Sequence, residues 1–240
     1  MPIETFPIGP LETNCHIVIS GSDAVAVDPG GDLNSGLGEV LALLKEQNLT
    51  LRAILCTHFH FDHLYGVAAL HEATGAPVYG PAGDASLLGT ELGGSGAWGF
   101  PPVTTFKWED LKEGPHTFGS IKCEVLTTPG HTPGSLSIYF PELNSIMTGD
   151  LLFYHSVGRT DFPGSSPAQV AAQEDLHPSA GNRSVSGPRP QHQRRRRTRQ
   201  QPVPLALTEP PSSPVRGSES IFLISLERFH GSAEKHQESG

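Results

Sequence analysis

Three histidines and an aspartate fall within six consecutive residues of this chain, inside the segment 57–63, which reads THFHFDH. Two later segments, Gly130-His131 and Gly149-Asp150, add one more histidine and one more aspartate. Imidazole nitrogens and carboxylate oxygens are ligands that zinc and other borderline divalent metals bind. The chain must therefore fold so that three segments far apart in sequence meet at one polar centre.

Each of these segments follows an apolar run that predicts a β-strand, at residues 52–56, 121–126 and 145–147. A loop that directly follows a strand lies at the end of a sheet, where a rigid scaffold can aim its side chains. We therefore expect the candidate ligands on loops along one edge of a sheet structure.

The spacing inside the first cluster favours two neighbouring metal positions over one. His58 and His60 are two apart in an extended loop, so their side chains point the same way. Asp62 and His63 follow where the chain turns into a helix, and they point to an adjacent position. Asp150 offers two carboxylate oxygens, enough to bridge a pair of metal ions.

Strand and helix patterns alternate through residues 1–172 with short connections. Two similar β-rich halves with interposed helices predict an α/β protein, built as a four-layer αββα sandwich. The Gly- and Pro-rich residues 89–102 are expected to form a loop over the site. The expected strands are 15–19, 24–28, 52–56, 78–79, 121–127, 135–140 and 145–149, and the expected helices are 35–48 and 63–74.

The pattern changes near residue 173. Residues 1–173 hold 6 Lys+Arg against 18 Asp+Glu, whereas residues 174–240 hold 10 against 7. Pro, Ser, Gln and Arg dominate this second part, and its composition predicts a disordered tail. The run Arg194–Arg197 could bind nucleic acid. We favour a translation artefact instead, because GC-rich codons read out of phase encode such a run.

Other features favour a cytoplasmic protein that does not cross a membrane. No apolar run approaches the ~20 residues of a membrane helix. The N-terminus shows no signal-like segment. The three cysteines lie in strand-like stretches without CxxC spacing, so buried free thiols are expected: Cys15, Cys56 and Cys123.

The segment 57–63 resembles the HxHxDH signature of metallo-β-lactamase-fold hydrolases. Further segments narrow the resemblance to the glyoxalase II-like branch, the hydroxyacylglutathione hydrolases and their short relatives. The resemblance runs almost without interruption from residue 3 to residue 172. Its segments are Leu11–Cys15, Asp28–Gly30, Thr128–Gly134, Thr148–Asp150 and Gly158–Phe162.

The resemblance implies a small-molecule thioester substrate, such as an S-acylglutathione, cleaved by a metal-bound hydroxide that Asp62 orients or holds. It also implies that Arg159 contacts the substrate and that Asp28 orients the site by hydrogen bonding. Zinc is the expected metal, with two sites, and Fe²⁺ is the alternative. The implied ligands are His58, His60 and His131 for the first ion, Asp62 and His63 for the second, and Asp150 as the bridge.

Members of this branch end with a further strand and a Pro-Gly-His-Gly motif, whose histidine completes the second metal site. No such motif follows residue 172. Read one nucleotide later with permitted codons, residues 186–190 give Pro-Gly-His-Gly, and the same frame continues through Pro204 to Asn-Pro-Phe-Leu. We therefore predict a frameshift near residues 171–174.

The frameshift would leave a metallo-β-lactamase-like domain at residues 1–172 that lacks its last strand and helix. Residues 173–240 would then be an out-of-frame tail, and the true domain would end near position 204. The second metal site is expected to be weakened in the chain as translated. His155 and His177 are expected to be solvated surface histidines rather than replacement ligands.

Two rival functions fit parts of this pattern. A persulfide dioxygenase on the same fold would bind one iron ion through His58, His131 and Asp150. A catalytically impaired remnant, or a basic-tailed binding protein, would bind no metal and would bind nucleic acid in a salt-sensitive way. The acyl group, the thiol carrier and the oligomeric state stay open at this point.

Overall fold

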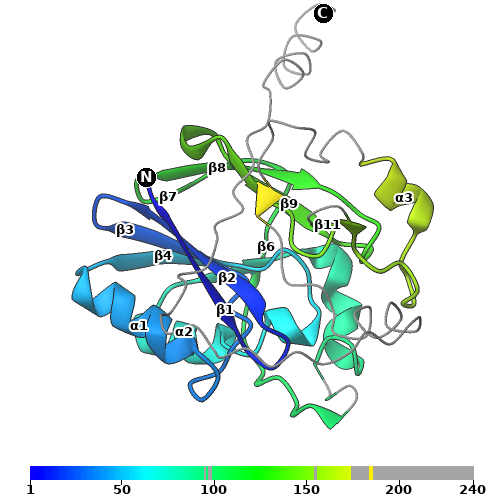
Figure 1. Cartoon of the computed structure of the whole chain (residues 1–240), viewed down its shortest axis with the longest axis horizontal. Coiled ribbons are helices and arrows are strands. Elements are labelled where there is room, and N and C mark those ends of the chain that lie inside the picture. The colour runs from blue at the N-terminus through cyan, green and yellow to red at the C-terminus, as the bar shows by residue number, and fades with distance from the viewer. Residues whose placement is uncertain (95, 97–98, 154–155, 174–183, 186–240) are drawn as a thin grey trace, which may run out of the picture.

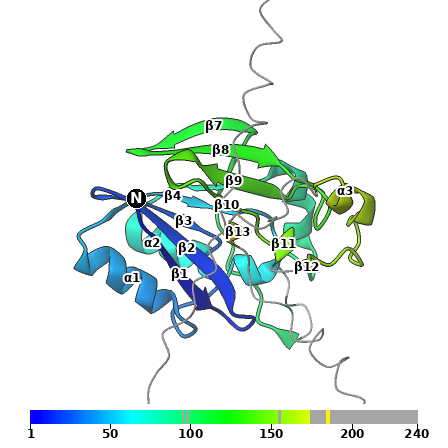
Figure 2. The same cartoon turned by 45° about the horizontal axis from the view of Figure 1, so that its top comes forward.

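The structure is a computed structural model that describes residues 1–94, 96, 99–153, 156–173 and 184–185. Two β-sheets pack face to face at its centre, and helices cover the outer face of one of them (Figures 1 and 2). This arrangement is the predicted sandwich of α/β layers.

The first sheet has six strands, which follow one another in chain order. The first three strands pair antiparallel, and the pairings from β3 to β6 are parallel. The strands are β1 (Ile3–Ile8), β2 (Thr13–Ser20), β3 (Asp23–Val27), β4 (Thr50–Leu55), β5 (Val78–Gly80) and β6 (Glu109–Asp110).

The second sheet has five strands in the order β13-β10-β9-β8-β7. Its strands pair antiparallel, except that β13 lies parallel to β10. A two-stranded ribbon, β11 (Leu152–Phe153) with β12 (Ser156–Val157), follows β10. The five strands are β7 (Gly114–Phe118), β8 (Ile121–Thr127), β9 (Leu136–Phe140), β10 (Ser145–Met147) and β13 (Ser184–Val185).

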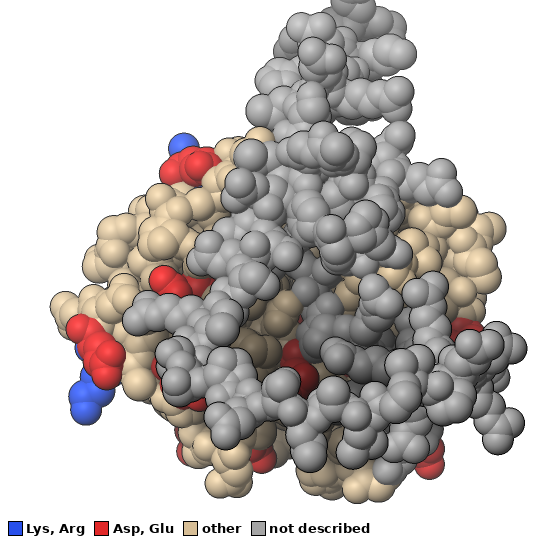
Figure 3. All heavy atoms as spheres, in the orientation of Figure 1, with Lys and Arg blue, Asp and Glu red and all other residues tan. Residues whose placement is uncertain are grey.

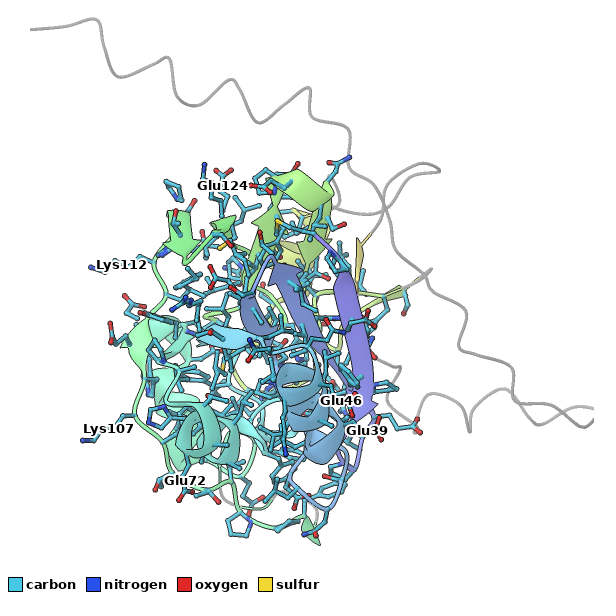
Figure 4. The ribbon with its side chains drawn as sticks, turned by 90° about the vertical axis from the view of Figure 1, so that its left-hand side faces the viewer. Glu39, Glu46, Glu72, Lys107, Lys112 and Glu124 are labelled. Atoms are coloured by element: carbon cyan, nitrogen blue, oxygen red, sulfur yellow. The ribbon has the colours of Figure 1, made fainter. Side chains whose placement is uncertain are left out.

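Helices α1 (Leu37–Glu46) and α2 (Val67–Thr74) cover the outer face of the first sheet (Figure 1). Glu39 and Glu46 of α1, labelled in Figure 4, are exposed. Among the described residues the second half of the chain has one α-helix, α3 (Pro167–Ala171). The 3₁₀ helices are η1 (Phe61–His63), η2 (Ala82–Gly89) and η4 (Pro141–Leu143).

Strand β2 shows how the apolar side chains divide between two cores. Cys15, Ile17 and Ile19 belong to the cluster that packs under the helices, and Val18 belongs to the cluster between the sheets. Side chains alternate between the two faces of a strand, so a strand that is apolar on both faces is a central one. The apolar content of β2, β3 and β4 thus places these strands in the middle of the sandwich.

The expected strands and helices are confirmed with small shifts at their ends. The helix expected at 63–74 begins as η1, turns, and continues as α2. The sequence prediction missed the short strands β6, β11, β12 and β13, and it also missed the edge strands β1 and β7. Both β1 and β7 contain a proline, Pro7 and Pro115, which is tolerated at a sheet edge but obscures the strand pattern.

The three cysteines are free and buried, as expected. In the part of the chain that the structure describes, no helix has the length and apolar character to span a membrane. The expectations for the tail, including Arg194–Arg197 and His177, fall outside the described residues, and so does the expectation for His155.

Candidate metal centre

Three loops meet at one edge of the sandwich. They follow β4, β8 and β10, and they carry the segment 57–63, His131 and Asp150 respectively. A backbone hydrogen bond joins the first loop to the start of β9, where the second loop ends, since Leu136 N donates to Thr57 O at 2.8 Å. A side chain at Gly149 would overlap the Thr57 hydroxyl, so glycine lets the Asp150 loop approach this closely.

The structure brings together all six side chains that the sequence singled out as ligands. The donor atoms lie within 4.8 Å of one another in the group His58, His60, His131, and likewise in the group Asp62, His63, Asp150. Asp28, His58 and His63 form a third such group.

Asp150 faces both of the first two groups. Its Oδ1 lies 3.3 Å from His63 Nε2, and its Oδ2 lies 3.7 Å from His131 Nε2. One carboxylate therefore presents a separate oxygen to each group, an arrangement that can bridge two metal ions.

A chain of hydrogen bonds orients His58. The Thr57 hydroxyl donates to Asp28 Oδ2 at 2.6 Å, and the Thr57 amide donates to Asp28 Oδ1 at 2.8 Å. Because the hydroxyl proton is used in this way, the Thr57 oxygen accepts from His58 Nδ1 at 3.0 Å. The lone pair of His58 is then on Nε2. This network confirms the expected role of Asp28 in orienting the site.

Three buried nitrogens lack a hydrogen-bond partner among the described residues: His58 Nε2, His63 Nδ1 and His63 Nε2. His63 Nδ1 does lie 3.0 Å from Asp28 Oδ2, but without hydrogen-bond geometry. Leaving buried polar atoms unpaired costs free energy, and a bound cation would satisfy lone pairs of this kind. The donor set, with imidazole and carboxylate only, fits zinc or iron.

The loop after β12 supports His131 from outside. His131 Nδ1 donates to the Arg159 carbonyl at 2.9 Å, which leaves the Nε2 lone pair facing the centre. The Ser165 hydroxyl donates to the His131 carbonyl at 2.7 Å. A side chain at Gly158 would overlap the Asp150 carbonyl, so this loop packs directly against the ligand loop.

Burial and mutual repulsion set the charges of the histidines. Burial lowers the pKa of His58 and of His60, and the neighbouring imidazoles lower both further. These two side chains are therefore neutral at pH 7, the form that binds a metal ion. Burial also lowers the pKa of His63, but Asp62, Asp28 and Asp150 outweigh it and raise the pKa well above its usual value.

The pKa values of the two carboxyl groups of the centre, Asp62 and Asp150, shift in opposite directions. Burial raises the pKa of Asp62, partly offset by His63 and by the Thr13 hydroxyl, which donates to Asp62 Oδ2 at 3.0 Å. Burial also acts to raise the pKa of Asp150. The nearby His63 and, less strongly, His131 and His60 outweigh burial and lower this pKa to about 2. Asp150 is thus fully ionised at neutral pH.

Aromatic side chains form part of the rim. The Phe162 ring lies 5.3 Å from the His60 ring, and the Arg159 guanidinium lies 4.1 Å above Phe162. The Gly- and Pro-rich loop packs against the ligand segment, because Phe61 N donates to Leu92 O and the Phe61 ring lies 5.3 Å from Phe100. The expectation that this loop lies over the site agrees with these contacts.

Sequence reasoning missed several supporting residues. Thr13, Thr57 and Asp84 each hydrogen bond to a ligand or its loop. Thr57 could have been found from its place next to His58. Thr13 lies in the segment 11–15 that carries the family resemblance, but its partner Asp62 is distant in sequence. Asp84 carries no such signal, because its partners are also distant.

This fold and this set of donors are those of the metallo-β-lactamase superfamily, whose family model matches residues 8–199, and the chain belongs to that superfamily. The chain is 36% identical over 163 residues to the probable metallo-hydrolase YqgX of Bacillus subtilis, which covers 67% of this chain and 75% of that protein. It is 29% identical to the hydroxyacylglutathione hydrolase GloC of Haemophilus influenzae over 168 residues, 68% of this chain and 77% of that protein.

The chain is also similar in structure to solved members of this fold. The structure of the BLEG-1 B3 metallo-β-lactamase has a TM-score of 0.70 and 34% identity, covering 79% of this chain and 92% of that one. The di-iron-bound form of TTHA1623 has a TM-score of 0.63 and 35% identity, with 79% and 93% covered. ETHE1 from Myxococcus xanthus has a TM-score of 0.54 and 27% identity, with 71% and 66% covered.

Zinc is expected to stabilise the protein, because it would occupy the buried lone pair of His58 Nε2 and would replace the proton of His63 beside the carboxylates. At a free zinc concentration 100 times the dissociation constant, the free energy of unfolding should rise by about 2.7 kcal/mol. Denaturant unfolding with and without zinc measures this. His58→Ala should lose most of the gain, whereas His116→Ala, a histidine of β7 outside the cluster, should keep it. Equal gains in both variants would place the zinc elsewhere.

Proposed function

We propose that this protein hydrolyses a small-molecule thioester, with metal ions held by His58, His60, His131, Asp62, His63 and Asp150. The observation that carries the proposal is Asp150, whose two oxygens face one donor group each. The similarity to the hydroxyacylglutathione hydrolase GloC supports the substrate class. Three buried free thiols support a reducing compartment, the cytoplasm.

Bound metal supplies Lewis acidity and makes water a nucleophile at neutral pH. In the hydrolysis the water oxygen bonds to the acyl carbon and the carbon–sulfur bond breaks. The acyl group leaves as an acid and the sulfur leaves as a thiol. Asp62 is the proposed catalytic residue: it orients the attacking water, and the Thr13 hydroxyl fixes its carboxylate.

The first experiment measures thiol release from S-lactoylglutathione by the zinc-loaded protein. We expect metal-dependent turnover that a chelator abolishes. Asp62→Asn should reduce kcat/KM by roughly 10²- to 10⁴-fold, because it removes the group that orients the water. Asp110→Asn, an exposed aspartate of β6, is the matched control and should retain activity.

The same preparation loaded with Fe²⁺ tests the rival dioxygenase, for which the ETHE1 structure is the relevant neighbour. Oxygen consumption with a persulfide and no thiol release from the thioester would overturn the hydrolase proposal. Absence of metal binding, together with salt-sensitive nucleic-acid binding, would support the binding-protein reading instead.

We further propose that Arg159 anchors an anionic group of the substrate. The described domain is strongly acidic, and acidic side chains predominate among the charged groups visible in Figure 3. Arg159 is the cation that the structure places beside the cluster, above Phe162 and near enough to His60 to lower its pKa. Asp161 accepts from its guanidinium through both oxygens, at 2.7 and 2.8 Å. A substrate carboxylate can replace the exposed Asp161 at small cost, since exposed ion pairs contribute little.

Arg159→Ala is expected to raise KM for the anionic S-lactoylglutathione about 10- to 100-fold, the effect of losing one charge-assisted hydrogen bond. The value of kcat should change little, because His131 Nδ1 donates to the backbone carbonyl of Arg159, which the substitution keeps. A neutral thioester should be unaffected, and Lys122→Ala on β8 is the control. Equal losses on both substrates would mean that Arg159 only supports the loop.

We also propose that residues 1–172 are the metallo-β-lactamase domain and that residues 173–240 are read out of frame. The strand β13 supports this, because it lies parallel to β10 with Met147 opposite Val185. Asp150 is three residues beyond Met147, and position 188 is three beyond Val185. A chain that continued in this register would bring position 188, a histidine in the shifted frame, level with Asp150.

Reading the coding DNA across codons 165–206 tests the frame. We expect an inserted or missing base near codons 171–174, and codons for residues 186–190 that give Pro-Gly-His-Gly one nucleotide later. Codons that cannot give this motif would contradict the proposal. In that case residues 173–240 are the genuine continuation of the chain.

A further inference from the structure

Asp84 lies between two of the ligand loops, and nothing in the proposed reaction uses it. It belongs to η2, and its side chain is completely buried. Its Oδ2 accepts from Phe59 N at 3.1 Å and from the Thr132 hydroxyl at 2.7 Å. Its Oδ1 accepts from Gly134 N at 2.7 Å. A buried carboxylate is costly unless such donors satisfy it.

These donors come from the two loops that supply the first donor group. The Phe59 amide lies between His58 and His60, and Thr132 directly follows His131. The carboxylate of Asp84 therefore joins the backbone on both sides of the cluster.

The backbone of η2 and the backbone of the His131 loop also contact each other at two glycines, Gly83 and Gly134. A Cβ atom at Gly134 would lie 2.6 Å from Asp84 N, and one at Gly83 would lie 2.8 Å from Gly134 Cα. Neither glycine has a positive φ that only glycine tolerates, so the close approach of the backbones is what requires them. The contact leaves no room for the His131 loop to move closer to η2.

We propose that Asp84 is a positioning residue of the metal centre. Its carboxylate sets the separation between the loop of His58 and His60 and the loop of His131, and so holds the three imidazoles at the distance that one metal ion requires. Groups that support ligands in this indirect way typically contribute 10- to 100-fold to metal affinity. The inference rests on metal binding and is independent of the substrate.

Asp84→Asn is the sharpest variant because it keeps the shape of the side chain. Each carboxylate oxygen accepts from a backbone N–H, which cannot become an acceptor. The asparagine NH₂ group must therefore face a donor, Phe59 N in one orientation and Gly134 N in the other. The repulsion between these two N–H groups should increase the distance between Asp84 and the ligand loop that carries the facing amide.

The experiment is a competition titration of the full chain with zinc and a chromophoric chelator, at a temperature where all variants are folded. Wild type tests whether the centre binds zinc at all. Asp84→Asn should raise the dissociation constant of the tightest site about 10- to 100-fold. It should also alter the visible spectrum of the Co²⁺-loaded protein, which reports ligand geometry. Asp110→Asn changes another carboxylate that accepts from a backbone amide of η2, Ala82 N, into an amide that can still accept, and it should change neither.

Two further variants cover the case in which Asp84→Asn does not fold. Thr132→Val removes one donor to Asp84 and keeps the side-chain shape. Gly134→Ala pushes the His131 loop away from η2 without removing any polar group. Both should weaken zinc binding in the same direction. Variants that lower the melting temperature of the zinc-free protein but leave the zinc dissociation constant and the Co²⁺ spectrum unchanged would overturn the inference, because Asp84 would then be only structural.

Discussion

Buried imidazoles have to be held in place by hydrogen bonds, and in this protein those bonds come from groups outside the ligand set. The Thr57 hydroxyl between Asp28 and His58 is the clearest case, since it forces the lone pair of His58 onto Nε2. The Arg159 carbonyl does the same for His131. The chemistry of the centre therefore depends on which nitrogen of each ring is protonated, and the surrounding fold decides that.

The two-sheet sandwich brings the ligand loops to one place, where the surrounding residues can orient them. Strands β4 and β10 belong to different sheets, yet both deliver ligand loops to one edge. The loops can approach only because glycine stands at their contacts, as at Gly149 beside Thr57. Close backbone contact and defined tautomers are two aspects of one constraint: six polar side chains from three loops must meet in one small cluster.

The ligand segments could be predicted from sequence because histidine and aspartate at such short spacing are chemically distinctive. The central strands could be predicted because they are apolar on both faces. Edge strand β1 could not, since Pro7 interrupts its pattern and half of its residues face solvent. Asp84 could not either, because one aspartate carries no mark of partners found 25 and 50 residues away.

The most direct test of this account is X-ray absorption at the zinc edge of the loaded protein. The account predicts a first shell of nitrogen and oxygen at about 2.0–2.2 Å, with the outer-shell scattering of several imidazole rings. Sulfur at about 2.3 Å, or a shell without imidazole scattering, would contradict it, because the metal would then lie away from the six side chains assembled here.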